Sequence, residues 1–197
     1  MIYPTIKELQ AVMAAKGYVF FTDGDYNLNI IGIRSSYRLT NRFDDTLVLA
    51  YKEGGYWRIH YIPCTTDPGL GPVERPRRGG VAVLKEGQYP GAYRLGLHKG
   101  KQRALVQVKP VTVWRDENGD HTYDRVRSET GLFGINIHWS STVRDSVQVD
   151  NWSEGCQVGS GAVDYELFLS LLDKAVACWG NSFTYTLLSE ADFVLEG

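Results

Sequence analysis

The sequence predicts a mainly β fold in a single domain, with one helix near each end. Twelve Tyr, five Trp and 21 Gly make an aromatic, turn-rich chain, a composition typical of β structure. From Tyr18 onward, apolar and polar residues alternate with the period of half-buried strands. The 197 residues, 43% of them hydrophobic, suffice for one core, and no linker, repeat or low-complexity segment divides them.

Two segments have helical periodicity instead. Residues 4–16 carry an apolar stripe and a Thr5-x-x-Glu8 capping box, and a glycine follows them. Residues 165–179 form a second amphipathic pattern, for which Asp164 is the expected N-cap, again with a glycine at the end. We therefore expect an N-terminal helix and a second helix that follows Cys156.

Between these helices the alternation predicts a series of short strands joined by turns. Asp44-Asp45 is interpreted as a solvated turn, residues 87–91 as a turn, and residues 70–80 as an irregular loop rich in Pro, Arg and Gly. The predicted strands are residues 18–21, 28–33, 46–51, 56–61, 81–84, 92–98, 104–108, 111–115, 130–138 and 183–188.

Charge and the N-terminal residues limit the partners. A net charge of −2 provides neither a basic surface for nucleic acid nor a polybasic membrane anchor. No apolar run is long enough to cross a membrane, and residues 1–8 lack the pattern of a signal peptide. We expect synthesis in the cytoplasm without a signal peptide, and no nucleic-acid or membrane partner. The sequence does not predict the oligomeric state.

Two polar clusters have open interpretations. Arg75, Arg77 and Arg78 are most simply a solvated loop, but arginines also pair with anionic ligands. Asp116, Asn118 and Asp120 alternate as calcium ligands do, yet Asn118-Gly119 is a preferred hairpin turn and the glutamate that ends an EF-hand loop is absent. The hairpin interpretation is favoured.

The three cysteines do not describe a disulfide framework. Cys64 and Cys178 are expected to be small buried hydrophobic residues, the latter on an apolar helix face. Cys156 differs because it follows Ser153-Glu154-Gly155, where a glycine allows the backbone to turn sharply.

Among the four histidines, His138 has the most informative surroundings. His60 alternates with apolar residues and His121 follows a turn, so both are interpreted as structural. His98 ends a predicted strand and is suited to line a pocket, but the sequence gives it no partner. His138 ends a glycine-punctuated run and precedes Cys156 by 18 positions. An imidazole near a thiol can accept its proton, so this pair is a candidate nucleophile and base.

The residues around this pair resemble a known catalytic signature. Phe133–His138 followed by Ser153–Cys156 is similar to the L,D-transpeptidase (YkuD-like) family, in which a strand histidine precedes Ser/Thr-His-Gly-Cys. Residues 65–69 and 89–95 are similar to its upstream turn and strand. The resemblance covers a catalytic core at residues 56–160. Residues 1–45, with the N-terminal helix and first strands, and residues 161–197, with the C-terminal helix and strand, lie outside it.

The resemblance implies an L,D-transpeptidase-like β-sandwich or barrel and cysteine-dependent acyl transfer or hydrolysis on peptidoglycan stem peptides. It implies Cys156 as the nucleophile, His138 as the general base and acid, and Ser153 as orienting His138 through its carbonyl. Backbone amides near Gly155 would hold an oxyanion. No cofactor or metal is implied. A bacteriophage lysin or a delivered effector, reaching the bacterial cell wall by a route other than a signal peptide, is the expected setting.

Departures from the family pattern leave the substrate open. Glu154 replaces the usual His, and Trp139 replaces the Gly that usually follows the catalytic histidine. Transferase and hydrolase activity, including carboxypeptidase or endopeptidase cleavage, are therefore not distinguished, nor is the bond that is cut. The expected substrate-binding residues are Trp139, Arg144, Trp152, Glu154 and Gln157.

Two alternatives to an enzyme remain open. A wall-binding or phage structural protein on the same fold would be non-catalytic. Zinc held by His138, Cys156 and a carboxylate is the other, although the sequence has neither C-x-x-C nor H-x-x-x-H spacing.

Overall fold

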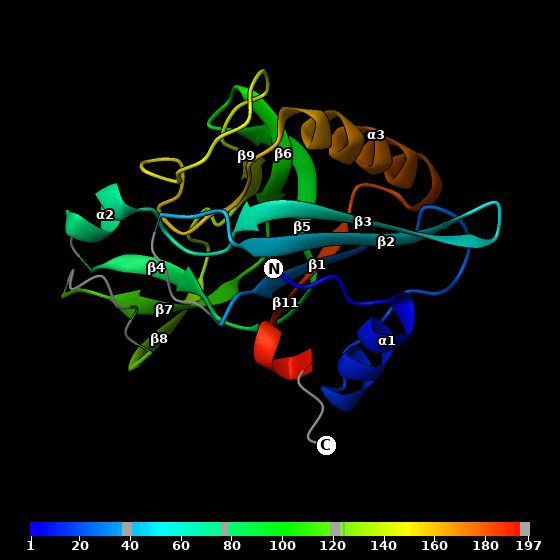
Figure 1. Cartoon of the computed structure of the whole chain (residues 1–197), viewed down its shortest axis with the longest axis horizontal. Coiled ribbons are helices and arrows are strands. Elements are labelled where there is room, and N and C mark those ends of the chain that lie inside the picture. Colours follow the sequence, from blue (N-terminus) through cyan, green and yellow to red (C-terminus); the bar gives the residue numbers. More distant parts are fainter. Residues whose placement is uncertain (37–40, 76–78, 119–122, 124, 194–197) are drawn as a thin grey trace.

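Figure 1 shows the computed structural model of the chain, which describes residues 1–36, 41–75, 79–118, 123 and 125–193. Eight strands close into a barrel, and three others form a small separate sheet. The mainly β class expected from the sequence is confirmed. Within the described residues, no helix is long and apolar enough to cross a membrane.

The barrel joins strands that are far apart in the sequence. β1 and β11 are parallel, as are β9 and β10, and the other neighbours are antiparallel. The expected hairpins across residues 53–55 and 99–101 are confirmed as β2–β3 and β5–β6. In barrel order, the strands are β1 (Asn29–Arg34), β11 (Phe183–Ser189), β5 (Gly87–His98), β6 (Gln102–Gln107), β9 (Ile137–Trp139), β10 (Gln157–Gly159), β3 (Tyr56–Thr65) and β2 (Asp45–Glu53).

The small sheet lies beside one end of the barrel, in the lower left of Figure 1. It consists of β4 (Val81–Leu84), β7 (Val111–Asp116) and β8 (Arg127–Gly131), in the order β4-β7-β8. A short helix, α2 (Leu70–Glu74), packs near it through Val73, which shares a small core with Val81, Val83 and Tyr123. The expectation of an irregular loop at residues 70–80 is therefore wrong for its first half.

The two main helices begin for different reasons. α1 (Ile6–Ala15) has the expected capping box, in which the Glu8 amide donates to Thr5 Oγ1 and the Glu8 carboxylate accepts from the Thr5 amide. α3 (Ala162–Trp179) begins earlier than expected, because Gly161 rather than Asp164 is the N-cap. The Asp145 carboxylate accepts a hydrogen bond from the Ala162 amide, so a distant loop provides the cap. A single 3-10 turn, η1 (Glu190–Phe193), ends the described chain.

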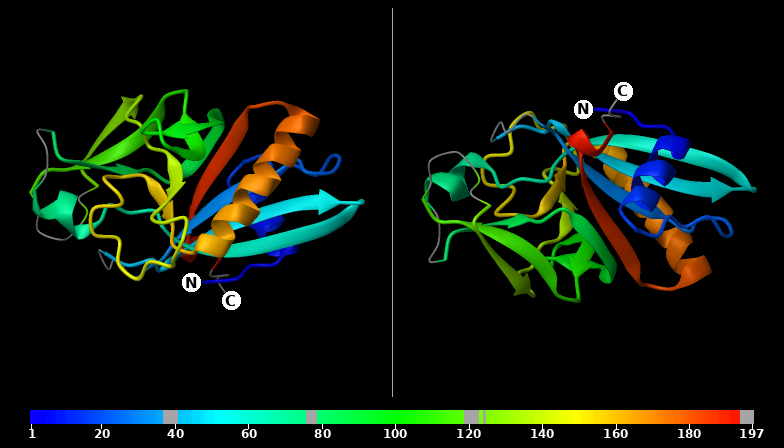
Figure 2. Two further views of the ribbon diagram at one scale, coloured as in Figure 1. Left: turned by 90° about the horizontal axis from the view of Figure 1, so that it is seen from above. Right: turned by 90° about the horizontal axis from the view of Figure 1, so that it is seen from below.

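The helices cover opposite faces of β1 and β2, as the two views of Figure 2 show. Ile30 and Leu49 belong to the main core together with Phe168 of α3. Ile31 and Val48, one position along each strand, pack in a second core with α1. Because successive side chains of a strand point to opposite faces, covering both faces buries nearly every residue of these strands.

Three predicted segments differ from the structure because side chains or glycines intervene. Residues 18–21 form no strand, since the amide and carbonyl of Val19 bond the Gln88 side chain and Phe21 bonds the Asn29 side chain. β5 runs through the expected turn at residues 87–91. The predicted strand 130–138 is two strands, β8 and β9, separated by residues 132–136, where Gly134 has φ +73°.

Asp45 is buried rather than solvated, which corrects the interpretation of Asp44-Asp45 as a solvated turn. Its carboxylate accepts hydrogen bonds from the Ser35 amide, the Thr66 amide and the Thr66 hydroxyl. Burial, reinforced by the nearby carboxylate of Asp67, raises the pKa of Asp45 to about 7. The turn preferences of aspartate did not reveal these distant amide donors.

The other cysteines differ from each other. Cys64 is buried, as expected, whereas Cys178 is exposed on α3, so the prediction for Cys178 is wrong. Arg77, Arg78, Asp120 and His121 lie outside the described residues.

Candidate active site

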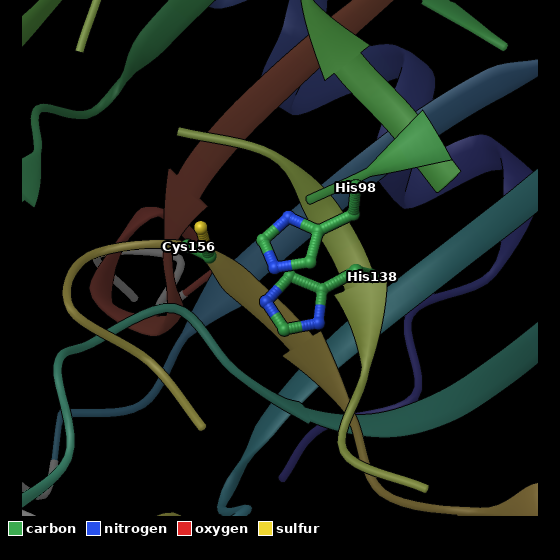
Figure 3. Close-up of side chains that lie close together, drawn as sticks. All are labelled: His98, His138 and Cys156. Carbon is green, nitrogen blue, oxygen red and sulfur yellow. The ribbon is translucent and has the colours of Figure 1, made fainter. Parts of the chain in front are cut away.

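The side chains of Cys156, His138 and His98 lie close together (Figure 3). Cys156 lies one residue before β10, His138 is the middle residue of β9, and His98 is the last residue of β5. β9 and β10 run side by side in parallel, with His138 opposite Val158. This pairing brings together the two residues that the sequence predicted as a pair.

The three side chains form a compact cluster. One nitrogen of each imidazole and the Cys156 sulfur all lie within 4.8 Å of one another. The two imidazole rings are stacked, with 3.9 Å between centroids and 15° between planes. Figure 3 shows a nitrogen-bearing edge of each ring turned toward the side where the sulfur lies.

The hydrogen bonds of His138 define which ring nitrogen is basic. Its Nδ1 lies 3.2 Å from the carbonyl oxygen of Trp139, and a carbonyl can only accept, so Nδ1 carries the proton. Nε2 is then unprotonated. It is buried and has no hydrogen-bond partner among the residues that the structure describes. A buried base with a free lone pair beside a thiol is suited to accept the thiol proton.

Both members of the pair are neutral at rest. Burial, with a smaller effect of His98, lowers the pKa of His138 to about 3. Burial raises the pKa of the Cys156 thiol to about 11, although the Asn136 amide donates to the sulfur at 3.4 Å and opposes this shift. The thiol itself donates to the Gly134 carbonyl at 3.4 Å. The geometry therefore suits proton transfer during attack rather than a preformed thiolate–imidazolium pair.

The second histidine is held in one tautomer by a chain of hydrogen bonds. The Gln107 amide donates to Asn136 Oδ1 at 2.9 Å, which turns Asn136 Nδ2 toward His98 Nδ1 at 2.9 Å. Because the amide nitrogen donates, His98 Nδ1 must accept, and the proton of the neutral ring is on Nε2. Burial lowers the pKa of His98, and nearby Lys99 adds to the effect, so the neutral form is favoured.

The turn before the cysteine differs from the expected arrangement. We expected the Ser153 carbonyl to orient His138, but that carbonyl accepts from the Gly69 amide at 2.9 Å, and the Trp139 carbonyl lies against His138 instead. The Ser153 hydroxyl donates to the Cys156 carbonyl at 2.8 Å and accepts from the Gly155 amide at 3.1 Å. Ser153 thus braces the cysteine turn, and the Gly155 amide, expected to hold an oxyanion, is already engaged.

Gly155 is nevertheless required by the backbone. Its φ is +126°, and a Cβ atom built there would lie 2.1 Å from the Ala82 carbonyl oxygen of β4. Any other residue would therefore push β4 away from the turn, which explains the glycine before Cys156.

A cleft of about 400 Å³ opens at the cysteine. Its walls come from α2, β4, β7, the end of β5 and the loops on either side of β9, and they include Arg75, Lys99, Arg115, Phe133, Glu154 and Cys156. A second cleft of about 500 Å³ adjoins it and shares His98, Lys99, His138, Asn151 and Trp152. The histidine pair therefore stands where two open clefts meet.

The five expected substrate-binding residues divide into two groups. Trp152 and Glu154 line the cleft at the cysteine. Trp139 lines the second cleft but not the cleft at the cysteine. Its indole is buried in the core, where Nε1 donates to the Gly161 carbonyl and the ring packs on Phe168. Gln157 is buried, and its side chain bonds the Tyr185 hydroxyl and backbone carbonyls. Exposed Arg144 lines neither cleft.

His98, His138 and Cys156 are residue types that also bind zinc, through imidazole nitrogen and thiolate sulfur. Here His98 Nδ1 accepts from Asn136 and Nε2 carries the proton, so neither nitrogen of His98 offers a lone pair. The rings are stacked nearly parallel, and in-plane lone pairs of parallel rings do not converge on one ion. In this arrangement the three residues do not fit a tetrahedral metal site.

The sequence did not identify Asn136 as a site residue, whereas the expectation that His98 lines a pocket is confirmed, although its partners were not predicted. Asn136 lies two positions before His138, and residues two apart in an extended segment share a face, which was the one available signal. His98 is 40 positions from His138, and only closure of the barrel brings the two together. No family model matches the chain, and no curated protein is significantly similar to it.

Proposed function

We propose that the protein is a cysteine enzyme that catalyses acyl transfer or hydrolysis, with Cys156 as the nucleophile and His138 as the general base and acid. One observation carries the proposal. The buried Nε2 of His138 has no hydrogen-bond partner among the described residues, and its ring lies beside the thiol at an open cleft. Leaving a buried polar atom unpaired is unfavourable for folding, so such an atom needs an explanation, and a catalytic role is one.

The reaction begins with the neutral pair. His138 Nε2 takes the thiol proton as the Cys156 sulfur attacks a carbonyl carbon, and the carbonyl electrons move to the oxygen. The Trp139 carbonyl, which holds Nδ1–H, stabilises the imidazolium that forms. When the oxyanion collapses, the carbon–nitrogen bond breaks, and His138 returns the proton to the leaving amine. Water or an amine then attacks the thioester, gives its proton to His138, and releases the thiol.

Peptidoglycan stem peptides are the proposed substrate. The support is the resemblance of residues 133–138 and 153–156 to the L,D-transpeptidase signature, whose donor is such a peptide. Two clefts that meet at His138 provide space for an acyl donor on one side and an acceptor on the other. Mass spectrometry of the product distinguishes water from an amine as the acceptor.

The test is digestion of purified sacculi, with the released and modified peptides identified by mass spectrometry. We expect wild type to change the stem peptides and Cys156→Ala to leave them unchanged. Cys178→Ala is the matched control, because Cys178 is exposed on α3 and lines neither cleft. Identical products from wild type and Cys156→Ala would overturn the proposal.

One observation favours a non-catalytic wall-binding protein as a second candidate. The pKa of Cys156 is raised to about 11, the opposite of the shift that activates many nucleophilic cysteines. This alternative predicts that wild type and Cys156→Ala sediment equally with sacculi and that neither changes the peptides.

A further inference from the structure

We propose that His98 is a catalytic residue, whose Nε2–H donates a hydrogen bond to the carbonyl oxygen that becomes negative when Cys156 attacks. This role rests on the proposed function, because it concerns the same acyl-transfer step. His98 would thereby stabilise the oxyanion, a role that the sequence analysis expected of backbone amides near Gly155.

The first argument is that the turn before Cys156 has few free N–H groups that could donate a hydrogen bond to the oxyanion. Acyl transfer to a thiol creates an oxyanion, and enzymes stabilise it with preorganised N–H groups. The Gly155 amide is directed to the Ser153 hydroxyl at 3.1 Å. The Asn136 amide is directed to the Cys156 sulfur at 3.4 Å. Of the backbone amides expected to act here, the Cys156 amide is the remaining candidate, and it needs a second donor.

The second argument is that hydrogen bonds place the proton of the His98 ring on Nε2. The amide of Gln107 fixes Asn136, and Asn136 donates to His98 Nδ1, so the proton of the neutral ring is on Nε2. A His98 ring that had the other tautomer would place two N–H groups against each other at Asn136. The hydrogen-bond chain therefore selects a donor at Nε2 before any substrate arrives.

The third argument is position. The His98 ring stacks on His138 at 3.9 Å, and a nitrogen of each ring lies within 4.8 Å of the sulfur. His98 is half-buried and lines both clefts, so its ring is reachable from the solvent side. Among the described residues, the one hydrogen bond of the His98 ring is that of Nδ1, which leaves Nε2 available to a bound carbonyl.

The two histidines then have separate tasks in one step. The thiol proton moves to His138 Nε2, the sulfur–carbon bond forms, and the carbonyl electron pair moves to the oxygen. His98 keeps its proton and shares it with that oxygen. When the oxyanion collapses, the amine leaves with the proton from His138. The same oxygen is then the neutral carbonyl oxygen of the thioester, and His98 still donates to it. No oxidant, reductant or further group is needed.

The experiment compares two reactions of the same thiol. p-Nitrophenyl acetate acylates Cys156 through a tetrahedral oxyanion, whereas iodoacetamide alkylates it without one. The variant His98→Phe retains a flat ring for the stack but has no donor. We expect its acylation to be slower by about 10²–10³-fold, the usual effect of losing one oxyanion donor, while alkylation stays near the wild-type rate. His98→Gln, whose amide can place an N–H near Nε2, is expected to recover part of the loss.

Each outcome has a distinct meaning. An unchanged ratio of acylation to alkylation in His98→Phe overturns the role of His98 and leaves the proposed function intact. Equal slowing of both reactions shows that His98 acts through the position or basicity of His138 and also overturns this inference. If wild type and Cys156→Ala are equally inert to the ester, the proposed function fails and the role of His98 fails with it.

Discussion

Two buried polar clusters of the barrel differ in how completely their atoms are paired. Around Arg34, the guanidinium donates to the hydroxyl and carbonyl of Thr66 and forms ion pairs with Asp67 at 3.1 Å and Glu86 at 3.0 Å. Asp67 Oδ1 accepts no hydrogen bond from the described residues, but the guanidinium still neutralises its charge. Asp45 beside it accepts three hydrogen bonds. At the other cluster, the buried Nε2 of His138 has no partner in the described part of the chain.

The difference separates a cluster that holds the barrel together from one that is available for chemistry. Buried charges are tolerated when each has a partner, and removing one partner is then costly. A buried base without a partner does not stabilise the fold, because its lost hydrogen bond to water is not replaced, but it is free to react. Mutations in the Arg34 cluster should therefore lower the free energy of unfolding, whereas mutations in the His138 cluster should lower the activity.

The largest effect is expected for His138→Phe. The aromatic ring preserves the stack on His98 but removes the general base, so acylation of Cys156 by p-nitrophenyl acetate should slow by about 10²–10⁴-fold. Urea unfolding should give a free energy equal to or above that of wild type, because the substitution removes a buried unpaired nitrogen. Loss of several kcal/mol of stability with retained acylation would reverse the assignment of the two clusters.

Arg34→Met should have the opposite profile. The apolar side chain leaves Asp67 and Glu86 without their buried partner, so the free energy of unfolding should fall by about 3–5 kcal/mol. Arg58→Met is the matched control, because Arg58 is exposed and its pair with Glu53 at 3.5 Å should contribute only about 0–1 kcal/mol. Equal destabilisation by the two substitutions, measured in urea, would contradict the comparison.

The pH dependence of stability should also distinguish the two clusters. In the folded protein the pKa of His138 is lowered to about 3 from an ordinary value of 6.5, so between these values the unfolded chain binds a proton that the folded protein does not. This histidine component should therefore remove stability as the pH falls from 6.5 toward 3, by up to about 1.4 kcal/mol per pH unit. Asp45, whose pKa is raised to about 7 from an ordinary value of 3.8, contributes with the opposite sign, so the difference between wild type and His138→Phe isolates the histidine. His138→Phe should lack this component, which urea unfolding at several pH values measures. Parallel curves for the two proteins would contradict the lowered pKa.

The smallest effect is expected at the rim of the clefts. Trp152 is 46% exposed and lines both clefts, so Trp152→Ala should weaken binding of the sacculus peptides by about 1 kcal/mol or less. The change in unfolding free energy should stay within about 0.5 kcal/mol. Arg144→Ala, which alters neither cleft, should leave KM unchanged. A larger effect of Arg144→Ala than of Trp152→Ala would show that the peptides bind outside the two clefts.

Sequence alone predicted the elements whose cause is local. The capping box at Thr5, the apolar run of β2 and the hairpin turn that joins β2 to β3 are each contained in a few consecutive residues. The pairing of His138 with Cys156 was also accessible, because a glycine turn and a histidine at a strand end lie close together in the chain. The burial of Asp45 was not, since its donors Ser35 and Thr66 lie 10 and 21 positions away.

His98 was expected to line a pocket, but its partner was missed for a related reason. Its position at the end of a strand was predicted, but its partner is set by barrel order, in which β6 separates β5 from β9. The start of α3 depended in the same way on Asp145, 17 positions before the helix amide that it caps. Contacts of this kind are fixed by topology rather than by the pattern within a segment.

The parallel pairing of β1 with β11 has a consequence for how the chain folds. Ile30 lies opposite Tyr185, so the barrel closes only after residues 155 positions apart have met. Closing so long a loop is entropically costly, and domains rich in such non-local pairings fold slowly. During synthesis, β1 and β2 are complete long before β11 leaves the ribosome. We expect refolding on the millisecond-to-second scale, with barrel closure as its last step.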